Sequence, residues 1–476
     1  MFYGREDDLL ALDRLWNKPV ASLVTCRGRR RIGKSTLIEE FAKRSKARFL
    51  EIEGLPPQPA QTNGDQLNHF AEQLREQSRW RGSCPTSWYE AMLALSGVIG
   101  EERTVVLLDE ISWMGAHDDS FPGILKTAWD RHFKKHPHLV FVLCGSVSTW
   151  IQENILNSTG FVGRATLNLV VGELPLRDCL RFWGGAAERV SAREVIDVLS
   201  VTGGVPRYLE ELDPGLSAVE NIQGMCFSPK ALLRDDFAKI FSSVFGENAV
   251  VKRRVLSALA KSPMTVSELA DAIGMERCGV LSKHLEQLVV AGFVVGDKGL
   301  NPLTQKPAKI IRYRLKDNYS RFYLKYIEPN AEMIDHDAFR CQSLESLKGW
   351  DSMMGCQFET LVTNNVSALL PHLGLERALL LSAAPFRQLP TARKRGCQVD
   401  LLLQTEGSVC LVEIKRMREI GPGIEDELRE KVARLAVKSG VSVRTALVYE
   451  GELSPRLAAS AYIDKFVDFS CLLKGV

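Results

Sequence analysis

Hydrophobic residues in the first third of the chain fall into short, continuous runs separated by polar segments. Residues 21–26, 104–108 and 139–144 are runs of this kind, and each has the length of a buried strand. Residues 36–42 follow the first run and carry apolar side chains at helical spacing. Buried strands that alternate with helices are typical of a parallel sheet. The pattern therefore predicts an α/β domain over residues 1–164.

The pattern becomes helical after this domain. Helical periodicity runs from about residue 165 to about residue 245 and is interrupted by Gly203-Gly204 and by two prolines. We interpret residues 165–247 as a helical segment attached to the α/β domain.

Three short amphipathic helices and two short strands are predicted over residues 248–330. Thr265 and Glu268 have the spacing of a capping box, and Gly274 is suited to end the same helix. This order of elements predicts a winged helix-turn-helix. The helices are expected at residues 252–259, 265–273 and 280–289, and the strands at 293–295 and 310–315.

The last part of the chain, residues 331–476, returns to a mixed pattern. A helix that begins near Gly355 has apolar residues at i, i+3 and i+4, and a Glu-Gly turn joins two of the following strands into a hairpin. We expect a second α/β domain here. After the first helix its elements are expected at residues 378–381, 398–403 and 409–415 (strands), 424–437 (helix) and 444–449 (strand).

Composition places the chain among ordinary multi-domain globular proteins. Of its 476 residues 45% are hydrophobic and 25% are charged, which excludes collagen-like and wholly disordered classes. No apolar run approaches the roughly 18 residues that a membrane-spanning helix needs. The first residues show no secretory pattern, and the 11 cysteines show no zinc spacing. We therefore expect a soluble, cytoplasmic protein of about three domains, with the helical segment belonging to the first.

Candidate chemistry first appears in the polar segment after the first apolar run. This segment contains the pattern G-x-x-x-x-G-K-S between a predicted strand and a predicted helix. Its glycines allow backbone N–H groups to surround phosphates, and the helix N-terminus adds the positive end of its dipole. Lys34 is suited to neutralise the β- and γ-phosphates of ATP, and Ser35 to bind Mg²⁺. Nucleotide-binding residues are expected at Gly28, Arg31, Ile32, Gly33, Lys34, Ser35 and Thr36.

Two further predicted strands end in polar residues. Asp109 and Glu110 follow residues 104–108, and Ser146 follows residues 139–144. Since the carboxyl ends of parallel strands meet at one edge of a sheet, we expect Asp109 to lie near the Mg²⁺ and the nucleotide. Glu110 is suited to orient or deprotonate the attacking water. Ser146 either contacts the γ-phosphate or the water, or is an ordinary turn serine.

These segments resemble the archaeal-type ATPases, a family on the AAA+/STAND side of the P-loop proteins. The resemblance lies in the P-loop block, in Leu-Leu-Asp109-Glu110 and in Leu-Cys-Gly-Ser146. It extends to the opening box Phe2-Tyr-Gly-Arg-Glu6 and to the turn Gly203-Gly-Val-Pro-Arg-Tyr-Leu209. The resemblance implies a RecA-like AAA+ core over residues 1–164 and a helical lid over residues 165–247.

Arg164 has a separate implication. Gly163-Arg164 resembles the family's arginine at this place, which usually reaches the nucleotide of a neighbouring subunit. The resemblance implies a homo-oligomer, for example a ring, in which one subunit supplies the P-loop and the next supplies Arg164 as a catalytic residue. The alternative is a surface arginine in a loop.

Charge is concentrated in the winged helix-turn-helix. The chain carries a net charge of only +3, but residues 248–330 hold 14 Lys and Arg against 7 Asp and Glu. This excess favours contact with the DNA backbone, although Glu286 on the third helix would repel phosphate. A structural or regulatory docking role is the alternative. The residues suited to phosphate contact are Lys283, Lys298, Lys309, Arg312 and Arg314.

Three polar residues of the C-terminal domain fall on neighbouring predicted strands. Glu413 and Lys415 share one face of a strand, because side chains alternate, and Asp400 begins the adjacent strand of the hairpin. Two carboxylates bind a hard cation such as Mg²⁺ or Mn²⁺, and a lysine stabilises charge at a scissile phosphate. Glu359, on the preceding helix, is suited to hold Lys415 or a water on the metal. The alternative is a hairpin with an incidental glutamate and lysine.

The spacing Asp–x₁₂–Glu–x–Lys after a helix glutamate resembles the PD-(D/E)XK nuclease fold, and especially the domain often fused to archaeal-type ATPases. Valine precedes Asp400 where the family usually has proline. The resemblance implies a restriction-endonuclease-like α/β domain over residues 331–476, with Asp400 and Glu413 as metal ligands and with Glu359 and Lys415 as catalytic residues. Arg393-Lys394-Arg395 either forms a basic patch for phosphate or is a solvated loop.

The predicted function is a Mg²⁺-dependent AAA+ ATPase coupled to a metal-dependent DNA endonuclease, acting in defence, mobile-element processing or repair. ATP, Mg²⁺ (or Mn²⁺ at the nuclease site) and DNA are the expected ligands, and the sequence does not identify protein partners other than further copies of the chain. Two alternatives stay open. One is a STAND-like signalling switch whose C-terminal domain binds DNA without cutting it, and the other is a DNA translocase.

Overall fold

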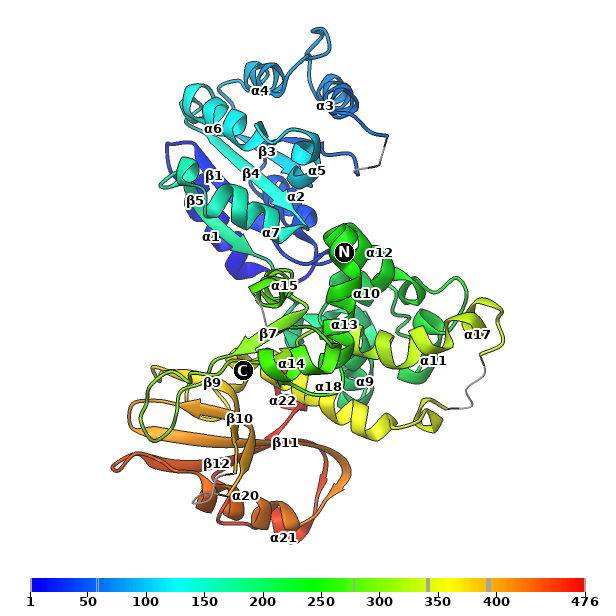
Figure 1. Cartoon of the computed structure of the whole chain (residues 1–476), viewed down its shortest axis with the longest axis vertical. Coiled ribbons are helices and arrows are strands. Elements are labelled where there is room, and N and C mark those ends of the chain that lie inside the picture. Colours follow the sequence, from blue (N-terminus) through cyan, green and yellow to red (C-terminus); the bar gives the residue numbers. More distant parts are fainter. Residues whose placement is uncertain are drawn as a thin grey trace. The chain divides into compact units, whose positions relative to one another are not determined.

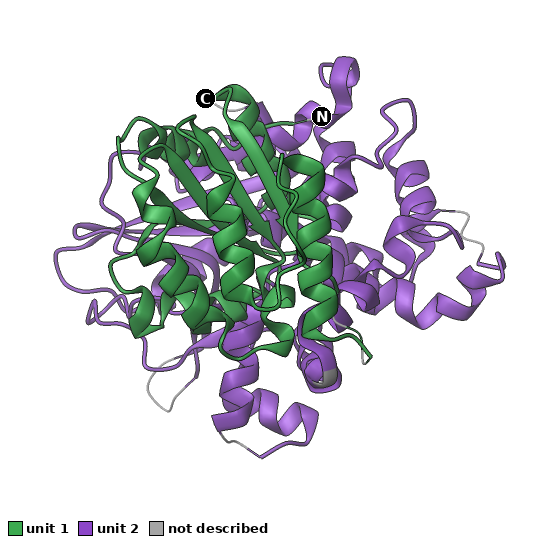
Figure 2. Ribbon diagram, turned by 90° about the horizontal axis from the view of Figure 1, so that it is seen from above, with its two compact units in different colours: residues 1–173, 290–292 green, residues 174–289, 293–476 purple. Residues whose placement is uncertain are grey.

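The structure, a computed structural model, describes residues 2–56, 58, 60–276, 279–339, 343–390 and 395–474. The chain divides into two compact units, which Figure 2 distinguishes by colour. The first unit contains residues 1–173 with residues 290–292, and the second contains residues 174–289 and 293–476. No helix among the described residues is both long enough and apolar enough to cross a lipid bilayer.

The first unit is built on a five-stranded parallel sheet with the strand order β2-β3-β4-β1-β5 (Figure 1). The three strands expected from apolar runs occupy its centre, where nearly every residue is buried. The strands are β1 (Ser22–Arg27), β2 (Arg48–Glu53), β3 (Thr104–Asp109), β4 (Leu139–Gly145) and β5 (Ala165–Val170).

Strand β5 differs from the sequence pattern, which predicts helix from residue 165. Residues 165–170 instead pair in parallel with β1 and form an edge of the sheet. Only Leu169 of this strand is fully buried. An edge strand of this kind lacks the continuous apolar run that identifies a central strand.

The helices of the first unit pack on the sheet through large apolar side chains. The buried cluster on one face combines alternate residues of the central strands with residues of α3, α4 and α6, such as Phe70, Trp88 and Phe121. The rings of Trp88 and Phe121 lie 4.7 Å apart between centroids. The helices are α1 (Glu6–Trp16), α2 (Lys34–Arg44), α3 (Asn63–Gln77), α4 (Trp88–Gly97), α5 (Ile111–Met114), α6 (Phe121–Arg131) and α7 (Ser148–Ile151).

The second unit begins with helices and continues into a small three-stranded antiparallel sheet. Thr265 and Glu268 form the expected capping box, and Gly274 ends α14 in the left-handed conformation. The sheet has the order β6-β8-β7, so a two-residue strand joins the two predicted wing strands. The elements are α8 (Leu176–Cys179), α9 (Ala192–Thr202), α10 (Pro206–Leu209), α11 (Ala218–Cys226), α12 (Asp236–Phe245), α13 (Ala249–Leu259), β6 (Met264–Thr265), α14 (Val266–Ile273), α15 (Gly279–Val290), β7 (Val294–Asp297) and β8 (Arg312–Leu315).

A second five-stranded sheet, with the order β13-β12-β11-β10-β9, forms the C-terminal part of this unit. Strands β9, β10 and β11 are antiparallel neighbours, whereas β12 and β13 run parallel to β11. The elements are α16 (Asn318–Phe322), α17 (Ala331–Asp335), α18 (Trp350–Asn364), α19 (Val366–Leu369), β9 (Ser382–Gln388), β10 (Cys397–Gln404), β11 (Ser408–Ile420), α20 (Gly423–Arg434), β12 (Ser442–Leu453), α21 (Pro455–Ala458), β13 (Lys465–Asp468) and α22 (Ser470–Lys474).

The first strand of this sheet lies later in the chain than predicted. Residues 378–381 form no strand, and the side chain of Leu379 is 82% exposed. The strand is β9, at residues 382–388. The apolar run was misleading because its leucines do not reach a core.

A buried polar contact joins the beginning of this unit to its C-terminal part. The side-chain amide of Gln357 on α18 donates to the carbonyl oxygen of Ser200 on α9 at 2.6 Å and to that of Asn318 on α16 at 2.7 Å. Gln357 is fully buried. The helices expected as a lid, the end of the winged segment and the C-terminal domain therefore share one core.

Candidate functional site

The loop between β1 and α2 has the backbone conformation that the P-loop pattern predicts. Arg31 and Gly33 have positive φ values of 72° and 84°, and α2 begins at Lys34. At Gly28 a Cβ atom would lie 2.3 Å from the carbonyl oxygen of Val171, so only glycine fits there. The guanidinium of Arg5, in the opening box, donates to the carbonyl oxygen of Ile32 at 3.0 Å and braces the loop.

The residues expected to hold Mg²⁺ lie in direct contact. Ser35 on the first turn of α2 donates a hydrogen bond from its hydroxyl to the carboxylate of Asp109 at the end of β3. Lys34 is buried and donates to the carbonyl oxygen of Arg29 at 3.3 Å. Thr36 follows in the same turn and is exposed. The contact between Ser35 and Asp109 fits a Mg²⁺ site, since both side chains supply oxygen atoms.

Glu110 and Ser146 form a contact that the sequence did not predict. Oε2 of Glu110 accepts hydrogen bonds from the backbone nitrogen of Ser146 at 3.0 Å and from its hydroxyl at 2.9 Å. Both residues are buried. Glu110 has φ of 45°, a conformation that costs a residue other than glycine about 1–3 kcal/mol and is found mainly at functional sites. Ser146 therefore fixes the direction in which the Glu110 carboxylate points.

Further acids surround Asp109. Glu53 lies opposite Asp109 in the register of β2 and β3, and Glu51 lies two residues earlier on β2. Burial, followed by the charge of Asp109, raises the pKa of Glu51 to about 7. The pKa of Glu53 is raised by the same two causes. Sequence reasoning missed this group of acids. A bound cation would reduce the repulsion between their negative charges.

Arg164 is paired within its own chain. Its guanidinium makes two hydrogen bonds to the carboxylate of Asp130, both at 2.9 Å, and Lys126 lies 3.0 Å from the same carboxylate. The hydrogen bonds from Arg164 lower the pKa of Asp130 to about 2. In the single chain, then, the residue expected to reach a neighbouring subunit has an intramolecular partner.

The four residues expected at the nuclease-like site line one cavity of about 590 Å³. Glu359 comes from α18, Asp400 from β10, and Glu413 and Lys415 from β11. Asp400 accepts a hydrogen bond from the backbone nitrogen of Ile414 at 3.0 Å. Of the adjacent basic segment, Arg393 and Lys394 lie outside the described residues, and Arg395 is exposed.

Four residues of α20 also line this cavity, and sequence reasoning missed all of them: Glu427, Glu430, Lys431 and Arg434. Nζ of Lys431 lies 2.6 Å from Oε2 of Glu413 and 2.8 Å from Glu427. Nζ of Lys415 lies 2.7 Å from Oε1 of Glu413 and 3.3 Å from Glu427. We call the side chains of Glu413, Lys415, Glu427 and Lys431 the ion ring. Carboxylates and ammonium groups alternate around it, and each contacts its two neighbours. Helical phase alone places Glu427 and Lys431 on one face, but it does not say which face meets β11.

The acids of the cavity destabilise one another's charge. Burial, and then the charge of Asp400, raises the pKa of Glu413 to about 7. Burial and the charge of Glu359 raise the pKa of Asp400, and burial raises that of Glu359. The described residues contain no group of three or more His, Cys, Asp or Glu side chains arranged to hold a metal ion. Asp400 and Glu413 fit a divalent cation only as a pair of carboxylates, with other oxygen atoms completing the coordination.

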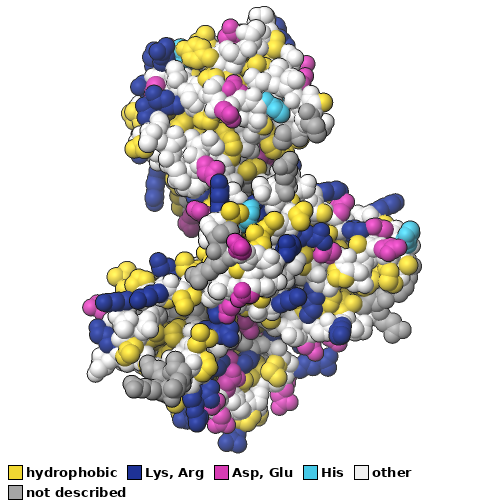
Figure 3. Space-filling view, in the orientation of Figure 1, with side chains coloured by type: hydrophobic (Ala, Val, Ile, Leu, Met, Phe, Trp, Pro, Cys, Tyr) yellow, Lys and Arg dark blue, Asp and Glu magenta, His cyan; other side chains and the backbone are white. Residues whose placement is uncertain are grey.

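The winged segment uses part of its positive charge internally. Arg312 forms an ion pair with Glu268 at 2.9 Å, and Arg314 forms one with Asp297 at 2.9 Å. Lys283, Lys298 and Lys309 are exposed. On the face drawn in Figure 3, Lys and Arg side chains lie among Asp and Glu side chains. Of the five residues suited to phosphate contact, two are thus already paired.

The loop between β7 and β8, the wing, docks on the C-terminal sheet. The side-chain amide of Gln404 on β10 donates to the carbonyl oxygen of Leu300 at 2.8 Å, and the backbone nitrogen of Leu300 donates to Ser382 at 3.3 Å. The backbone nitrogen of Lys438 donates to the carbonyl oxygen of Pro302 at 3.1 Å. Part of the wing is thereby fixed against its own chain.

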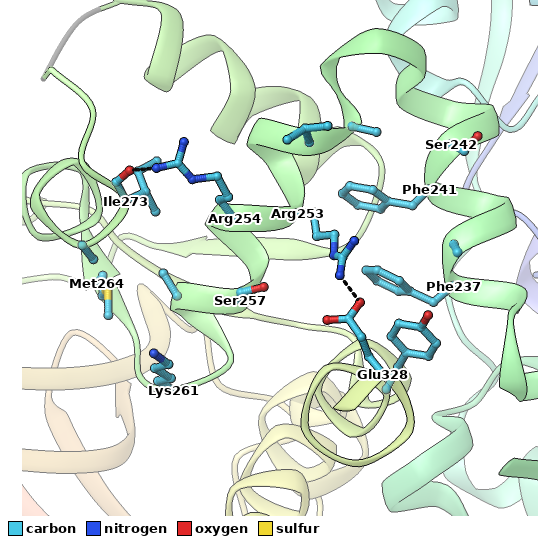
Figure 4. A pocket seen from close by; sticks show the side chains of 16 residues that line it. Phe237, Phe241, Ser242, Arg253, Arg254, Ser257, Lys261, Met264, Ile273 and Glu328 are labelled. Carbon is cyan, nitrogen blue, oxygen red and sulfur yellow. Dashed lines mark hydrogen bonds and ion pairs between the residues drawn. The ribbon is translucent and has the colours of Figure 1, made fainter. Parts of the chain in front are cut away.

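A larger cavity, of about 690 Å³, lies among α12, α13 and α14 (Figure 4). Phe237 and Phe241 form an apolar wall. Arg253 pairs with Glu328 at 2.6 Å, and Arg254 donates to the carbonyl oxygen of Ile273. Since these guanidinium groups have partners within the chain, we do not assign the cavity to either candidate site.

Comparison with known proteins supports part of this description. A helix-turn-helix domain family matches residues 251–297, which confirms the prediction of that motif. The uncharacterized protein MJECL04 of Methanocaldococcus jannaschii is 22% identical over 429 residues, or 87% of each chain. The uncharacterized ATP-binding protein MJ0423 of the same organism is 42% identical over 52 residues, which are 88% of that protein and 11% of this chain. The chain belongs to the family of this second relative.

Solved structures of P-loop ATPases match the chain more distantly. The Walker-type ATPase PABY2304 of Pyrococcus abyssi has a TM-score of 0.47 at 16% identity, over 68% of this chain and 96% of its own. The ORC2 protein of Aeropyrum pernix has a TM-score of 0.41 at 14% identity, over 70% of this chain and 94% of its own.

Proposed function

We propose that this protein is a Mg²⁺-dependent P-loop ATPase of the AAA+ type whose C-terminal domain cleaves DNA with the help of a divalent cation. The contact between Ser35 and Asp109, with Glu110 beside it, is the observation that supports ATP hydrolysis most directly. The relative named as an ATP-binding protein supports the choice of nucleotide. The shared cavity of Glu359, Asp400, Glu413 and Lys415 supports the second activity.

In the first unit each residue has a distinct task. The loop from Gly28 to Gly33 and the N-terminus of α2 bind the phosphates, and Lys34 neutralises them. Ser35 and Asp109 would hold Mg²⁺, which supplies charge neutralisation at the phosphates. Because Ser146 occupies Oε2 of Glu110, Oε1 is the oxygen that accepts a proton from the attacking water.

ATP hydrolysis by the full chain tests this assignment. Lys34→Ala should abolish binding of a fluorescent ATP analogue, and Glu110→Gln should keep binding while lowering kcat by at least about 100-fold. Lys43→Ala is the matched control, because Lys43 is an exposed lysine on the same helix. Hydrolysis by Glu110→Gln at the wild-type rate would reject Glu110 as the base.

In the second unit Asp400 and Glu413 would hold Mg²⁺ or Mn²⁺, which supplies Lewis-acid activation at a phosphodiester. Lys415, on the same face of β11 as Glu413, would stabilise the developing negative charge on the phosphate. Glu359 raises the local negative charge and would orient a water. The exposed lysines of the helix-turn-helix, such as Lys283, would contact the DNA backbone.

The test is incubation of linear, branched and single-stranded DNA with the protein and Mn²⁺. Glu413→Gln and Asp400→Asn should each abolish cleavage. Glu419→Gln, an exposed glutamate of the same strand, should cut like the wild type. Cleavage that survives in both site variants would reject the nuclease assignment.

A nucleotide-controlled switch is the second candidate function. The docked wing and the internal ion pairs of Arg312 and Arg314 favour it, since they indicate that the helix-turn-helix connects parts of the chain. A switch should hydrolyse ATP slowly, in a single turnover, without stimulation by DNA. Multiple-turnover hydrolysis that DNA accelerates would reject this alternative.

A self-association accompanies both proposals. Arg164 would act on the nucleotide of a neighbouring copy after leaving Asp130, because the neighbouring phosphates offer it a stronger concentration of negative charge. Native mass measured with a non-hydrolysable ATP analogue tests this. A chain that stays monomeric in the presence of the analogue would reject it.

A further inference from the structure

The ion ring contains a lysine with no place in the proposed chemistry. Lys415 lies two residues from Glu413 on the same strand, whereas Lys431 reaches Glu413 from α20. Lys431 makes a hydrogen bond of 2.6 Å to Oε2 of Glu413. Oε1 of Glu413 is buried and has no hydrogen bond of good geometry, although Nζ of Lys415 lies 2.7 Å away. Lys431 is therefore the better-oriented partner of this carboxylate.

The charges in the cavity explain why the contact between Lys431 and Glu413 affects cation binding. The ion ring is neutral, because Glu413 and Glu427 balance Lys415 and Lys431. Glu359 and Asp400 add two carboxyl groups that have no lysine of their own in the ring. Of the other charged residues that line the cavity, Glu430 pairs with Arg434, and Arg387 is exposed to solvent. A divalent cation matches this remainder in charge, but one oxygen of Glu413 is already taken by an ammonium group. A cation and Lys431 must compete for it.

Lys431 has a second carboxylate partner besides Glu413. Glu427 lies one turn earlier on the same helix and accepts Nζ of Lys431 at 2.8 Å. A lysine that leaves Glu413 can keep this partner, and it would face the cavity, where a phosphate group of a substrate can bind it. Arg429 of the same helix, by contrast, pairs with Glu425 outside the cavity.

We propose that Lys431 is a positioning residue. It binds the Glu413 carboxylate where a divalent cation would otherwise bind, and so weakens cation binding until a phosphate group draws Lys431 away. Cation and phosphate would then bind this site cooperatively. The inference rests on the proposed cation site, but it does not require that DNA is cut.

Calorimetric titration of the full chain with Mn²⁺ tests the proposal. Lys431→Met should bind Mn²⁺ at least about fivefold more tightly than the wild type, because a positive charge next to the site is removed. Lys431→Arg, which keeps the charge, should restore the wild-type affinity. Arg429→Met is the matched control and should leave the affinity unchanged. A short phosphodiester, such as a dinucleotide, should tighten Mn²⁺ binding to the wild type more than to Lys431→Met.

Several outcomes would overturn the inference. Equal or weaker Mn²⁺ binding by a folded Lys431→Met, or no Mn²⁺ binding by any variant, would each do so. Thermal unfolding of each variant shows whether it is folded, and Lys431→Gln provides a second neutral side chain if the methionine variant is not. A chain that follows the expected order of affinities but never cuts DNA would keep this inference and lose the nuclease proposal.

Discussion

Arg416 on β11 donates a hydrogen bond to the carboxylate of Asp197 on α9, 219 positions away in the sequence. The same guanidinium approaches Glu450 on β12 at 3.4 Å. The side chain of Arg416 is 7% exposed, and the residue follows Lys415 directly in the chain. A helix expected to belong to the ATPase lid is thus tied to the strand that carries the candidate nuclease residues.

Removal of Arg416 should destabilise the second unit. Arg416→Ala leaves Asp197 and Glu450 without their shared cation, and breaking a buried pair in this way costs about 3 kcal/mol. Arg418→Ala is the control, because Arg418 lies two residues later with its side chain 81% exposed. Urea unfolding followed by circular dichroism measures both. Equal free energies of unfolding for the two variants would contradict a structural role for the Arg416 contact.

Ser146 should affect turnover more than substrate binding. Ser146→Ala removes the hydroxyl that holds Oε2 of Glu110, so kcat for ATP hydrolysis should fall about tenfold with little change in KM. Ser112→Ala should have almost no effect, because its buried hydroxyl oxygen has no hydrogen-bond partner among the described residues. If KM changes and kcat does not, Ser146 contacts the nucleotide and does not act through Glu110.

Gly28 should tolerate no side chain. Gly28→Ala places a Cβ atom 2.3 Å from the carbonyl oxygen of Val171 and should weaken ATP-analogue binding by more than about tenfold, because the loop must shift. Gly97→Ala, at the end of α4, meets open space and should bind normally. Fluorescence titration compares them, and normal binding by Gly28→Ala would show that the loop adapts.

A mixing experiment tests whether Arg164 acts across subunits. Each variant should be inactive alone. Lys34→Ala does not bind the phosphates, and Arg164→Ala lacks the arginine that acts on the neighbouring nucleotide. Mixed in equal amounts, they should regain part of the wild-type ATPase rate, since some interfaces then combine an intact P-loop with an intact Arg164. An Arg164→Ala protein that hydrolyses ATP normally, or a mixture that stays inactive, would contradict the proposal.

The pair of Asp130 and Arg164 predicts a specific dependence on pH. The pKa of Asp130 falls from its ordinary 3.8 to about 2 in the folded chain, so the folded state favours the ionised form. This contribution to stability is fully present above pH 3.8 and is lost as the pH falls through 2. The difference in urea midpoint between the wild type and Asp130→Asn should therefore be larger at pH 6 than at pH 2.5. A difference that does not change with pH would argue against the ion pair.

Local sequence patterns predicted many of the helices and strands. The apolar runs identified β1, β3 and β4 because central parallel strands are buried on both faces. The edge strand β5 was missed since only one of its side chains is fully buried, and residues 378–381 were mistaken for a strand because apolar composition does not guarantee burial. Periodicity reports burial reliably only where a whole face of an element is covered.

By itself the sequence determined the P-loop, the helix-turn-helix and the grouping of Asp400, Glu413 and Lys415, because these depend on turns, caps and alternation along a few neighbouring residues. Only the tertiary structure decided which side chains contact the predicted site residues. Ser146 holds Glu110, Lys431 holds Glu413, and Asp130 holds Arg164 across separations of 18 to 36 residues. Such pairs depend on which faces of two elements meet after packing, and no local spacing contains that information.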